Sequence, residues 1–450
     1  MDALKPSDFY FFNIDEKRFF FHGPSCLIFD ISSDQFDSLE SSLAQGIRDD
    51  AVEVVGQSIA QHKKTLRFTS DQLEFKPNCL VLNVSGKCNL ACRYCFSQDK
   101  NGFKFKSMTT QECLDAVSYM IKNNPGEKNF TVSFFGGEPM LEKETIMSVV
   151  PAIVSSHPDK SFFFSITTNG TIMDDDFVRF IKEYRISILV SFDGPKDIES
   201  YNRPHKDSRI DTYSQVLLCA DKLRQNGVPF DFRATVVASD CRLMDIIELF
   251  ESLKVPYYLV PCFSSGNSNS ALYSDWNDKI LESFTAEYRK AMSYFLSKIS
   301  RNERVYCHSF YSKIKLVASQ FVSLRSCGLG ANMFSVTHGG NMFSCMNLAT
   351  HPETTIGNIY SGLNQDVWPK YLPFKVDSHE SCADCLIRYQ CVGGCLSERY
   401  DSASRSIGAP DENMCKLKRM MWQESVKTYQ TIKMHFPSVL ESLPDTIPVE

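Results

Sequence analysis

The feature that most constrains the fold is an alternation of short apolar runs with longer amphipathic stretches, which begins near residue 79. The runs are rich in β-branched and aromatic residues: CLVLNVS from Cys79, FTVSFF from Phe130, SFFFSITT from Ser161, ISILVSF from Ile186, FDFRATVV from Phe230 and PYYLVPCF from Pro256. The stretches between them, such as TQECLDAVSYMIKNN and DDFVRFIKEYR, repeat apolar residues at helical spacing. Strands that alternate with helices predict a parallel sheet. About six such units predict an α/β fold with a partial (β/α)6 barrel of the TIM type.

The chain on either side of this alternation has a different pattern. Before residue 77, FYFFNIDEKRFFF predicts a hairpin, CLIFDIS a further strand, and QFDSLESSLAQGIRDDAVEVVGQSIAQHK one or two helices. After about residue 300 the alternation gives way to cysteines, glycines and short irregular segments. We therefore expect three domains, at residues 1–76, 77–300 and 301–450, the last ending in a helix.

Composition and charge exclude several classes of protein. The chain has 450 residues, 43% of them hydrophobic, which is enough to bury a full-sized core. Its formal net charge of -6 gives no basic field for nucleic acid. The N-terminus is interrupted by Pro6, Asp8 and Asp15, so it does not match a signal peptide, and no stretch predicts a membrane span. The sequence predicts a cytoplasmic protein without nucleic-acid or membrane partners.

Cysteines are unusually frequent for such a protein, with 17 in the chain. In a reducing compartment they indicate metal or redox chemistry rather than structural disulfides. Isolated cysteines are expected to be small core residues, and that interpretation covers Cys26, Cys79, Cys113, Cys219, Cys241 and Cys262. The remaining cysteines lie in clusters.

The first cluster follows the first strand of the predicted barrel, where the catalytic sites of such barrels lie. SGKCNLACRYCFSQ places Cys88, Cys92 and Cys95 at the spacing C-x3-C-x2-C. Three thiolates on one loop can hold three irons of a [4Fe–4S] cluster and leave the fourth iron open. Zinc is the alternative, but it normally takes four ligands and this loop offers no fourth.

This loop, with Tyr94 before its last cysteine, resembles the cluster motif of radical S-adenosylmethionine (SAM) enzymes. The ends of the next three predicted strands carry further motifs of that family: FFGGEP, TTNG and SFDGP. Each motif alone is compatible with a turn or a strand end, but their order along one barrel supports the resemblance. The residues that it assigns to SAM binding are Tyr94, Gly136, Gly137, Glu138, Thr168, Asn169, Ser191 and, as a weaker candidate, Arg203 in YNRPH.

The resemblance implies a chemistry as well as a fold. In such enzymes the methionine amine and carboxylate of SAM chelate the open iron, and one electron from the cluster cleaves the sulfonium to give a 5′-deoxyadenosyl radical. Cys88, Cys92 and Cys95 would then be the catalytic cluster ligands. The protein would position a substrate C–H bond and exclude water and oxygen.

Seven further cysteines are clustered in the C-terminal region, which is more than packing requires. Two zinc sites are one interpretation, because C-x2-C pairs are frequent zinc ligands. Downstream of a radical SAM barrel, however, the set resembles the SPASM extension, which holds two auxiliary [4Fe–4S] clusters and would bring the total to three. The resemblance assigns an outer cluster to Cys382, Cys385, Cys391 and Cys415, and an inner one to Cys327, Cys345 and Cys395.

The C-terminal region departs from the fullest SPASM pattern in two ways. Anaerobic sulfatase maturases have another cysteine soon after the one that matches Cys327, and an aspartate after the one that matches Cys345; this chain has no such cysteine, and Met346 stands at the second position. The inner cluster would thus lack one cysteine ligand. Cys307 could supply it, or a substrate thiolate could, as resemblance to the maturases of cysteine-rich SCIFF peptides implies.

The N-terminal domain resembles the winged-helix-like recognition element of maturases that act on ribosomally synthesised peptides. Such elements bind a leader peptide as an added edge strand. The preferred function is therefore the installation of a thioether or carbon–carbon cross-link in a precursor peptide, with a reductant such as flavodoxin or ferredoxin. The alternatives are a sulfatase-type maturase that oxidises Cys or Ser to formylglycine, and a non-catalytic, zinc-stabilised peptide-binding protein.

Overall fold

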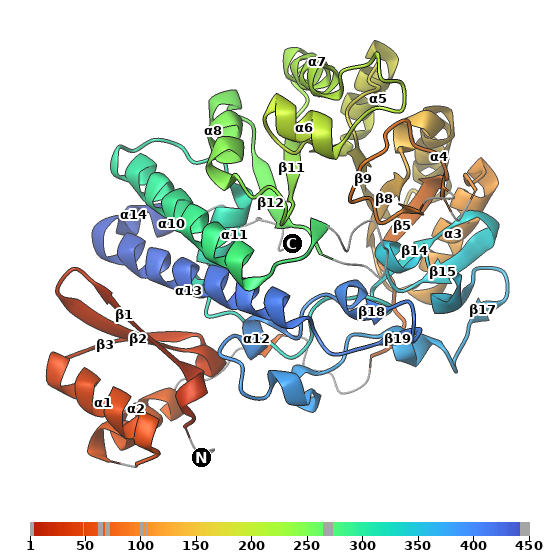
Figure 1. Ribbon diagram of the computed structural model, residues 1–450. Coiled ribbons are helices and arrows are strands. Elements are labelled where there is room, and N and C mark those ends of the chain that lie inside the picture. The colour runs from red at the N-terminus through yellow and green to blue at the C-terminus, as the bar shows by residue number, and fades with distance from the viewer. Residues whose placement is uncertain are drawn as a thin grey trace.

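The computed structural model describes residues 4–47, 49–61, 66–67, 73–99, 102–103, 106–263 and 273–441. Figure 1 shows an N-terminal sheet with two helices, a large sheet with helices on its outer side, and C-terminal helices and loops that lie between them.

The N-terminal part is a three-stranded antiparallel sheet followed by two helices. Its strands are β1 (Phe9–Ile14), β2 (Lys17–His22) and β3 (Leu27–Ile31), in that order across the sheet, and its helices are α1 (Ser33–Gln45) and α2 (Asp50–Gln61). The hairpin predicted from FYFFNIDEKRFFF is confirmed, since Phe11 pairs with Phe20 in the β1–β2 register. Helix α1 begins at a capping box in which Ser32 and Gln35 satisfy each other's backbone N–H.

The six predicted strands form adjacent parallel strands of one sheet, so the central prediction of the fold is confirmed. They are β5 (Cys79–Ser85), β8 (Asn129–Gly136), β9 (Ser161–Thr168), β10 (Ser187–Ser191), β11 (Phe230–Val236) and β12 (Tyr257–Pro261). Because parallel neighbours share a direction, their carboxyl ends lie along one edge of the sheet. Each motif identified in the sequence lies at that edge.

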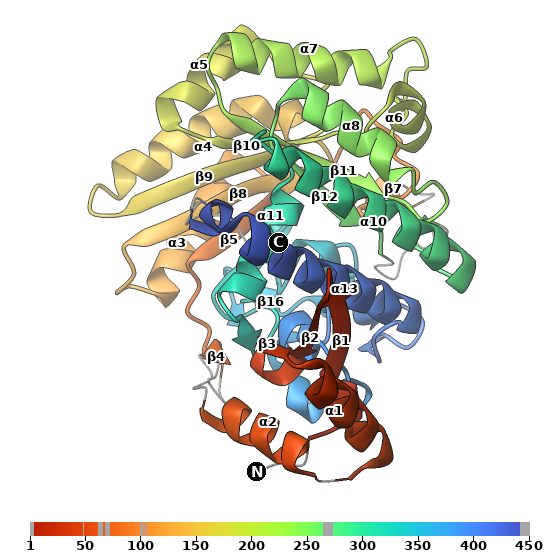
Figure 2. The same cartoon turned by 90° about the vertical axis from the view of Figure 1, so that its left-hand side faces the viewer.

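Helices connect these strands and cover the outer face of the sheet (Figure 2). They are α3 (Thr110–Asn123), α4 (Lys143–Ser156), α5 (Asp175–Tyr184), α6 (Lys196–Asn202), α7 (Thr212–Gln225) and α8 (Leu243–Leu253). In α5 the apolar residues Phe177, Val178 and Ile181 are buried, while Asp174 caps the helix by accepting from the backbone N–H of Phe177.

Burial alternates along the strands and decides which side chains reach the concave side of the sheet. On β11, Phe232 and Ala234 are fully buried toward the helices, whereas Arg233 and Thr235 are only partly buried. The same alternation occurs on β8 and β9. Polar side chains on these strands therefore face the interior of the barrel rather than the helix layer.

The sheet continues beyond the predicted barrel, which the sequence did not indicate. Strand β14 (Met333–Val336) pairs in parallel with β5, and β15 (Asn341–Phe343), β16 (Gly357–Asn358) and β17 (Gly362–Leu363) extend the sheet to ten strands. The buried amide of Asn83 donates to Ser335 Oγ at 2.6 Å and joins β5 to β14. The C-terminal region thereby covers an edge strand that would otherwise be unpaired.

Three long helices join the C-terminal region to the rest: α10 (Asp278–Ser300), α11 (His308–Ala318) and α13 (Glu412–His435). The N-terminal sheet packs on α13 through a cluster that includes Phe12, Phe19 and Trp422. Shorter elements are α12 (Arg388–Cys391), α14 (Pro437–Glu441) and the pairs β4 (Leu66–Arg67) with β13 (Val322–Ser323), β6 (Gln98–Asp99) with β7 (Gly102–Phe103), and β18 (Tyr400–Asp401) with β19 (Ser406–Ile407). In the described part of the chain, every helix is too short or too polar to cross a bilayer.

Candidate functional site

The motifs at the ends of successive strands meet around one cavity of about 210 Å³. Residues from five segments line it: Cys88, Cys92, Tyr94 and Cys95 after β5, Gly136, Gly137 and Glu138 at the end of β8, Thr168 and Asn169 at the end of β9, Ser191 on β10, and Arg203 after α6. The structure thus brings together every residue that the sequence assigned to the first cluster and to SAM.

The cysteine loop is anchored by backbone contacts to the segment that follows α6. The N–H of Ala91 donates to Pro204 O at 2.8 Å, and the N–H of Arg93 donates to Asn202 O at 2.9 Å. The side chain of Arg93 adds a 2.7 Å bond to Tyr201 O. The YNRPH segment therefore fixes the path of the loop as well as supplying Arg203.

The three thiols of this loop are close enough to repel one another when ionised. Burial raises the pKa of Cys88 to about 11, and Glu138 and Cys95 add to the effect. Burial also raises the pKa of Cys92 well above its usual value, with Cys95 and Cys88 contributing. Thiolates are the metal-binding form of cysteine. Because the pKa values of Cys88 and Cys92 are raised, the loop fits a cationic metal centre, which would stabilise its thiols as thiolates.

The carboxylate of Glu138 accepts three hydrogen bonds at the wall of the cavity. Its Oε1 accepts from the N–H of Met140 at 2.9 Å and from Thr168 Oγ1 at 2.7 Å, and its Oε2 accepts from the N–H of Asn169 at 2.7 Å. The side chain is only 1% exposed. Because it links the end of β8 to the end of β9, this carboxylate fixes the two loops relative to each other.

A buried network holds Arg203 beside the cluster loop. Arg203 donates to Glu199 Oε1 at 3.2 Å and to the hydroxyl of Tyr94 at 3.1 Å, and that hydroxyl donates to Asp193 Oδ2 at 2.7 Å. Burial raises the pKa of Asp193, although Arg203 opposes the effect. Arg203 thus provides a positive charge beside the buried carboxyls of Glu199 and Asp193, and it also lines the cavity.

The sequence interpretation missed two charged residues of the site. Asp193, in SFDGP, is fully buried and accepts from the N–H of Thr235 at 3.0 Å, which ties β10 to β11. Arg233 lines the cavity from β11. The signal for both was present, because each is a charge placed in or directly after an apolar strand, where an unpaired charge is costly.

The structure also brings together the three cysteines assigned to the inner auxiliary cluster. Burial raises the pKa of Cys345 far above its usual value. The neighbouring thiols of Cys395 and Cys327 raise it further through charge repulsion. The neighbouring residues Met346 and Asn347 line the main cavity. This group of thiols therefore adjoins the cavity through the segment that follows Cys345.

The four cysteines assigned to the outer cluster line one small cavity near α13. They share it with three basic residues: Cys382, Cys385, Cys391 and Cys415 are accompanied by Arg388, Lys418 and Arg419. Arg419 Nη1 lies 4.0 Å from Cys385 Sγ. In the described residues, no three His, Cys, Asp or Glu side chains converge closely enough for a single metal ion.

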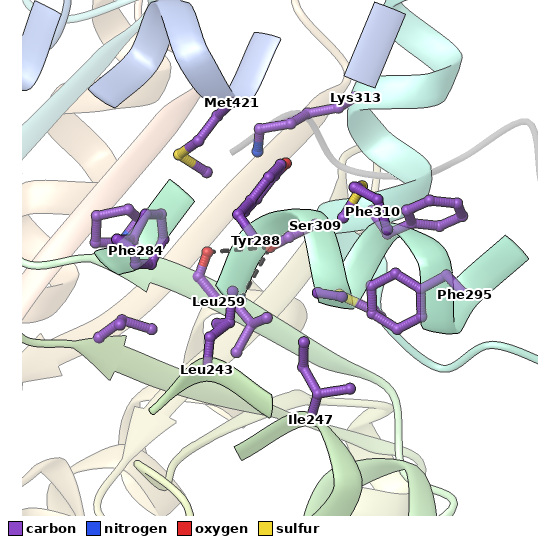
Figure 3. Close-up of a pocket in the computed structure, with 15 residues that line it drawn as sticks. Leu243, Ile247, Leu259, Phe284, Tyr288, Phe295, Ser309, Phe310, Lys313 and Met421 are labelled. Carbon is purple, nitrogen blue, oxygen red and sulfur yellow. Dashed lines mark hydrogen bonds between the residues drawn. The ribbon is translucent and has the colours of Figure 1, made fainter. Parts of the chain in front are cut away.

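Cys307 does not join the inner thiols. It precedes α11, is 1% exposed, and lines a separate apolar cavity behind β11 and β12. Figure 3 shows Tyr288, Lys313 and Met421 around this cavity, with Ser309 bonded to the backbone of Leu259. The charges acting on Cys307 come mainly from Glu251 and Lys313. Cys307 thus lines a different cavity from the one that Met346 and Asn347 line, and its role as the fourth inner ligand stays a prediction.

The fold and the cavity define an α/β protein with a thiol cluster at the carboxyl edge of a mostly parallel sheet. Residues 82–250 match the model of the radical SAM superfamily. The chain therefore carries a radical SAM domain, a class whose members use SAM and a [4Fe–4S] cluster.

The similarity of this chain to known proteins extends beyond that domain. A cysteine-type anaerobic sulfatase-maturating enzyme of Clostridium perfringens is 24% identical over 337 residues, which cover 70% of this chain and 88% of the relative. The structure of native anSMEcpe with bound AdoMet superposes with a TM-score of 0.66 at 21% identity and covers 80% of this chain and 100% of that one. The Streptococcus suis protein SuiB, bound to precursor peptide SuiA, gives a TM-score of 0.52 at 14% identity and covers 90% and 98% of the two chains.

Proposed function

We propose that the chain is a radical SAM maturase that abstracts a hydrogen atom from a residue of a precursor peptide and installs a thioether or carbon–carbon cross-link. The observation that carries this proposal is the convergence of the three-thiol loop, GGEP, TTNG and Ser191 around one cavity. Each motif lies at the carboxyl edge of a parallel sheet, where barrel enzymes build their active sites.

Cys88, Cys92 and Cys95 would hold three irons of the catalytic [4Fe–4S] cluster. When bound, the cluster and SAM supply a one-electron reductive cleavage that yields the 5′-deoxyadenosyl radical. The open iron has no further protein thiol in this loop, which leaves it for the amine and carboxylate of SAM. Asn169 Nδ2 lies 3.8 Å from Cys88 Sγ and orients that thiol.

The cavity offers separate groups for the two ends of the methionine moiety. The backbone at Gly136 and Gly137 would receive the amine, with Glu138 holding that backbone in place through its three hydrogen bonds. Ser191 and Arg203 would face the carboxylate, because both line the cavity and Arg203 is one of the main charges acting on Cys92. The protein's contribution is thus orientation in a site with little access to water.

The two C-terminal groups of thiols would form a SPASM region with two auxiliary [4Fe–4S] clusters. Four thiols in the outer group satisfy a complete cluster. Three thiols in the inner group would leave one iron without a cysteine ligand. Met346 and Asn347, which follow Cys345, line the main cavity, which supports a location of that iron near the cavity. A substrate thiolate at this position would hold a peptide cysteine next to the site of hydrogen abstraction.

Peptide recognition is assigned to the N-terminal sheet, within a division at residues 1–76, 77–300 and 301–450. Strand β1 packs toward α13 through Phe12, whereas β3 pairs only with β2 among the described strands. The outer edge of β3 thus offers backbone groups to an added strand of a leader peptide. Anchoring of this sheet by the 2.6 Å ion pair of Asp8 with Arg388 would hold a leader at a fixed distance from the outer thiols. A cytoplasmic flavodoxin or ferredoxin would supply the electron.

Sulfatase maturation is the second candidate, because the C. perfringens relative is a sulfatase-maturating enzyme. Met346 argues against it, since a thioether side chain cannot serve as the base that the resemblance to those maturases places after Cys345. A direct comparison is to incubate the protein with a cysteine-containing sulfatase peptide and SAM. Formylglycine in that peptide would establish the second candidate and exclude cross-linking as the main activity.

The first experiment is a metal and cofactor assay on protein purified without oxygen. Wild-type protein is expected to contain about twelve irons and equal sulfide, for three four-iron clusters, and to convert SAM to 5′-deoxyadenosine under reduction. Cys92→Ala should retain only the auxiliary iron and lose SAM cleavage. Cys113→Ala, a buried core cysteine on α3, is the matched control and should keep both. Zinc in place of iron in wild-type protein, or SAM cleavage by Cys92→Ala, would refute the proposed function.

A further inference from the structure

Arg233 occupies a position in the cavity that the proposed function leaves without a role. It lies on β11 beside Ser191 of β10, with which it is in register. Arg233 and Thr235 share the concave face of the strand, and both line the cavity. A guanidinium group therefore reaches into the space that holds the cofactor and the reacting part of the substrate.

The Arg233 side chain has no ion pair and no hydrogen bond among the described residues, although it is partly buried. Other arginines withdrawn from water have partners: Arg203 pairs with Glu199, and Arg388 with Asp8. Arg325 and Arg399 donate to backbone carbonyl groups. An arginine withdrawn from water without a partner is unfavourable, and its planar fork matches a carboxylate in two parallel hydrogen bonds. The side chain is thus placed to receive an anion from outside the chain.

Carboxylates near Arg233 are already engaged or turned away from it. Glu138 accepts three hydrogen bonds, and Asp193 accepts from Tyr94 and from the N–H of Thr235. Asp231 lies two residues earlier on the same face of β11, and burial alone raises its pKa to about 6. A nearby guanidinium would lower that pKa, so Arg233 points toward the cavity and not toward Asp231.

Arg233 acts less on the cluster thiols than Arg203 does. Arg203 is among the main charges that act on the thiols of Cys88 and Cys92, and Arg233 is not among them. The neighbouring strand β12 contributes Val260 to the wall, followed by Phe263, and Met346 comes from the inner thiol segment. With Ser191 and Arg203 assigned to the cofactor carboxylate, an apolar wall and a second cation remain for the substrate.

We propose that Arg233 binds a carboxylate of the peptide substrate, so that the modified residue is flanked by Asp or Glu. This inference rests on the proposed function and specifies its substrate class. The carboxylate would fix the peptide beside the cofactor through a bidentate pair in a partly desolvated site. Selectivity follows because an amide in place of the carboxylate leaves the guanidinium without its charge partner.

The test compares two synthetic peptides, acetyl-Gly-Ser-Cys-Asp-Ser-Gly-amide and its Asn counterpart. Their affinities are measured by anaerobic calorimetry on cluster-loaded, full-length protein with saturating SAM. Wild-type protein is expected to prefer the Asp peptide by roughly 10- to 100-fold, as a charge-assisted bidentate pair implies. Arg233→Met should abolish the preference, and Arg233→Glu should reverse it toward a peptide with Lys at that position.

The controls separate the possible sources of the carboxylate. Asp231→Asn, on the same face of β11, should keep the wild-type preference. SAM affinity, measured by equilibrium dialysis, should be unchanged in Arg233→Met and reduced in Ser191→Ala. If Arg233→Met instead loses SAM affinity and keeps the peptide preference, the carboxylate belongs to the cofactor and the inference is wrong. Equal binding of the two peptides by wild-type protein, or no binding of either, would also overturn it.

The proposed function can fail separately. Iron content and 5′-deoxyadenosine formation by wild-type protein decide whether the chain is a radical SAM enzyme, and neither needs a peptide. If both are present and the peptides are not distinguished, only the assignment of Arg233 fails.

Discussion

Lys418 Nζ lies 2.7 Å from Glu398 Oε2 and 3.0 Å from Glu398 Oε1, and both residues line the cavity of the four outer cysteines. The pKa of Lys418 is raised overall, because burial lowers it but the charges of Glu398, Cys391 and Cys395 more than offset that effect. The loop Gly393–Gly394 joins Cys391 to Cys395. A Cβ at Gly394 would lie 3.0 Å from Lys418 Nζ, so only glycine lets the loop pass so close to the ammonium group.

Lys418→Met is expected to destabilise the C-terminal region. It removes the partner of Glu398, whose side chain is only 6% exposed, and breaking such a pair costs about 3 kcal/mol. The free energy of unfolding is measured by urea titration of anaerobically prepared protein, together with iron content. Lys416→Met is the control, because Lys416 forms an exposed pair with Asp278, and it should behave as wild type. Equal stability of the two variants would show that the buried pair contributes nothing.

Gly136→Ala should disrupt the cofactor site through the backbone. Gly136 has φ of +126°, and a Cβ there would lie 2.5 Å from the carbonyl oxygen of Ser85, which accepts from the N–H of Gly137. Strain in that conformation costs at least about 2 kcal/mol and would shift the GGEP loop. We expect a lower melting temperature and loss of SAM binding.

Gly126→Ala is the matched control for this change. A Cβ at Gly126 would meet no atom within 4 Å, so thermal stability and SAM affinity should stay at wild-type values. A Gly136→Ala variant that bound SAM normally would show that the loop tolerates the displacement.

Thr168→Val tests whether Glu138 must be held to form the SAM site. The hydroxyl of Thr168 donates to Glu138 Oε1 at 2.7 Å in a buried environment. Removing it loses one of three hydrogen bonds to the carboxylate, worth about 1–3 kcal/mol. SAM affinity should fall several-fold when measured by equilibrium dialysis. Thr131→Val, at a half-buried position of β8, should leave it unchanged.

Much of the fold was accessible from the sequence because its signals are local. Apolar runs such as those from Phe130 and Ser161 became β8 and β9, and the cysteine loop and GGEP lie at strand ends as expected. The pairing of β14 with β5 could not be predicted from the sequence, because it joins segments about 250 residues apart. The hydrogen bond between Asn83 and Ser335 spans the same separation. Sequence spacing carries no information on such contacts.

The same distinction applies to the site. Cys92 was identified from the spacing of the cysteines, and Glu138 from the resemblance of GGEP to a radical SAM motif. The contact that fixes Arg203 depends on how α6 and the cluster loop pack, and the location of Cys307 depends on which face of the sheet it occupies. Asp193 and Arg233 stand out in the sequence as charges at apolar strands, but their places in the site depend on the register between β10 and β11, which only the folded chain shows.

The buried carboxyl of Glu199 predicts how stability changes with pH. Burial raises the pKa of Glu199 to about 8, with Arg203 opposing the shift and Asp193 adding to it. A carboxyl whose pKa is higher in the folded than in the unfolded chain binds its proton more tightly in the native state. The free energy of unfolding should therefore fall as pH rises from the unfolded pKa, about 4.3, toward about 8, and level off above that range.

Urea titrations of anaerobically prepared protein between about pH 6 and about pH 8 measure this dependence. The slope reports the release of up to about one proton when the protein unfolds. Glu199→Gln should flatten the slope, although Asp193, whose pKa burial also raises, would keep part of it. Glu144→Gln is the control, because the side chain of Glu144 is 83% exposed, and it should retain the wild-type slope. A stability that does not change with pH across this window in wild-type protein would mean that Glu199 is already ionised in the native state, held by Arg203 and by the N–H of Asp193.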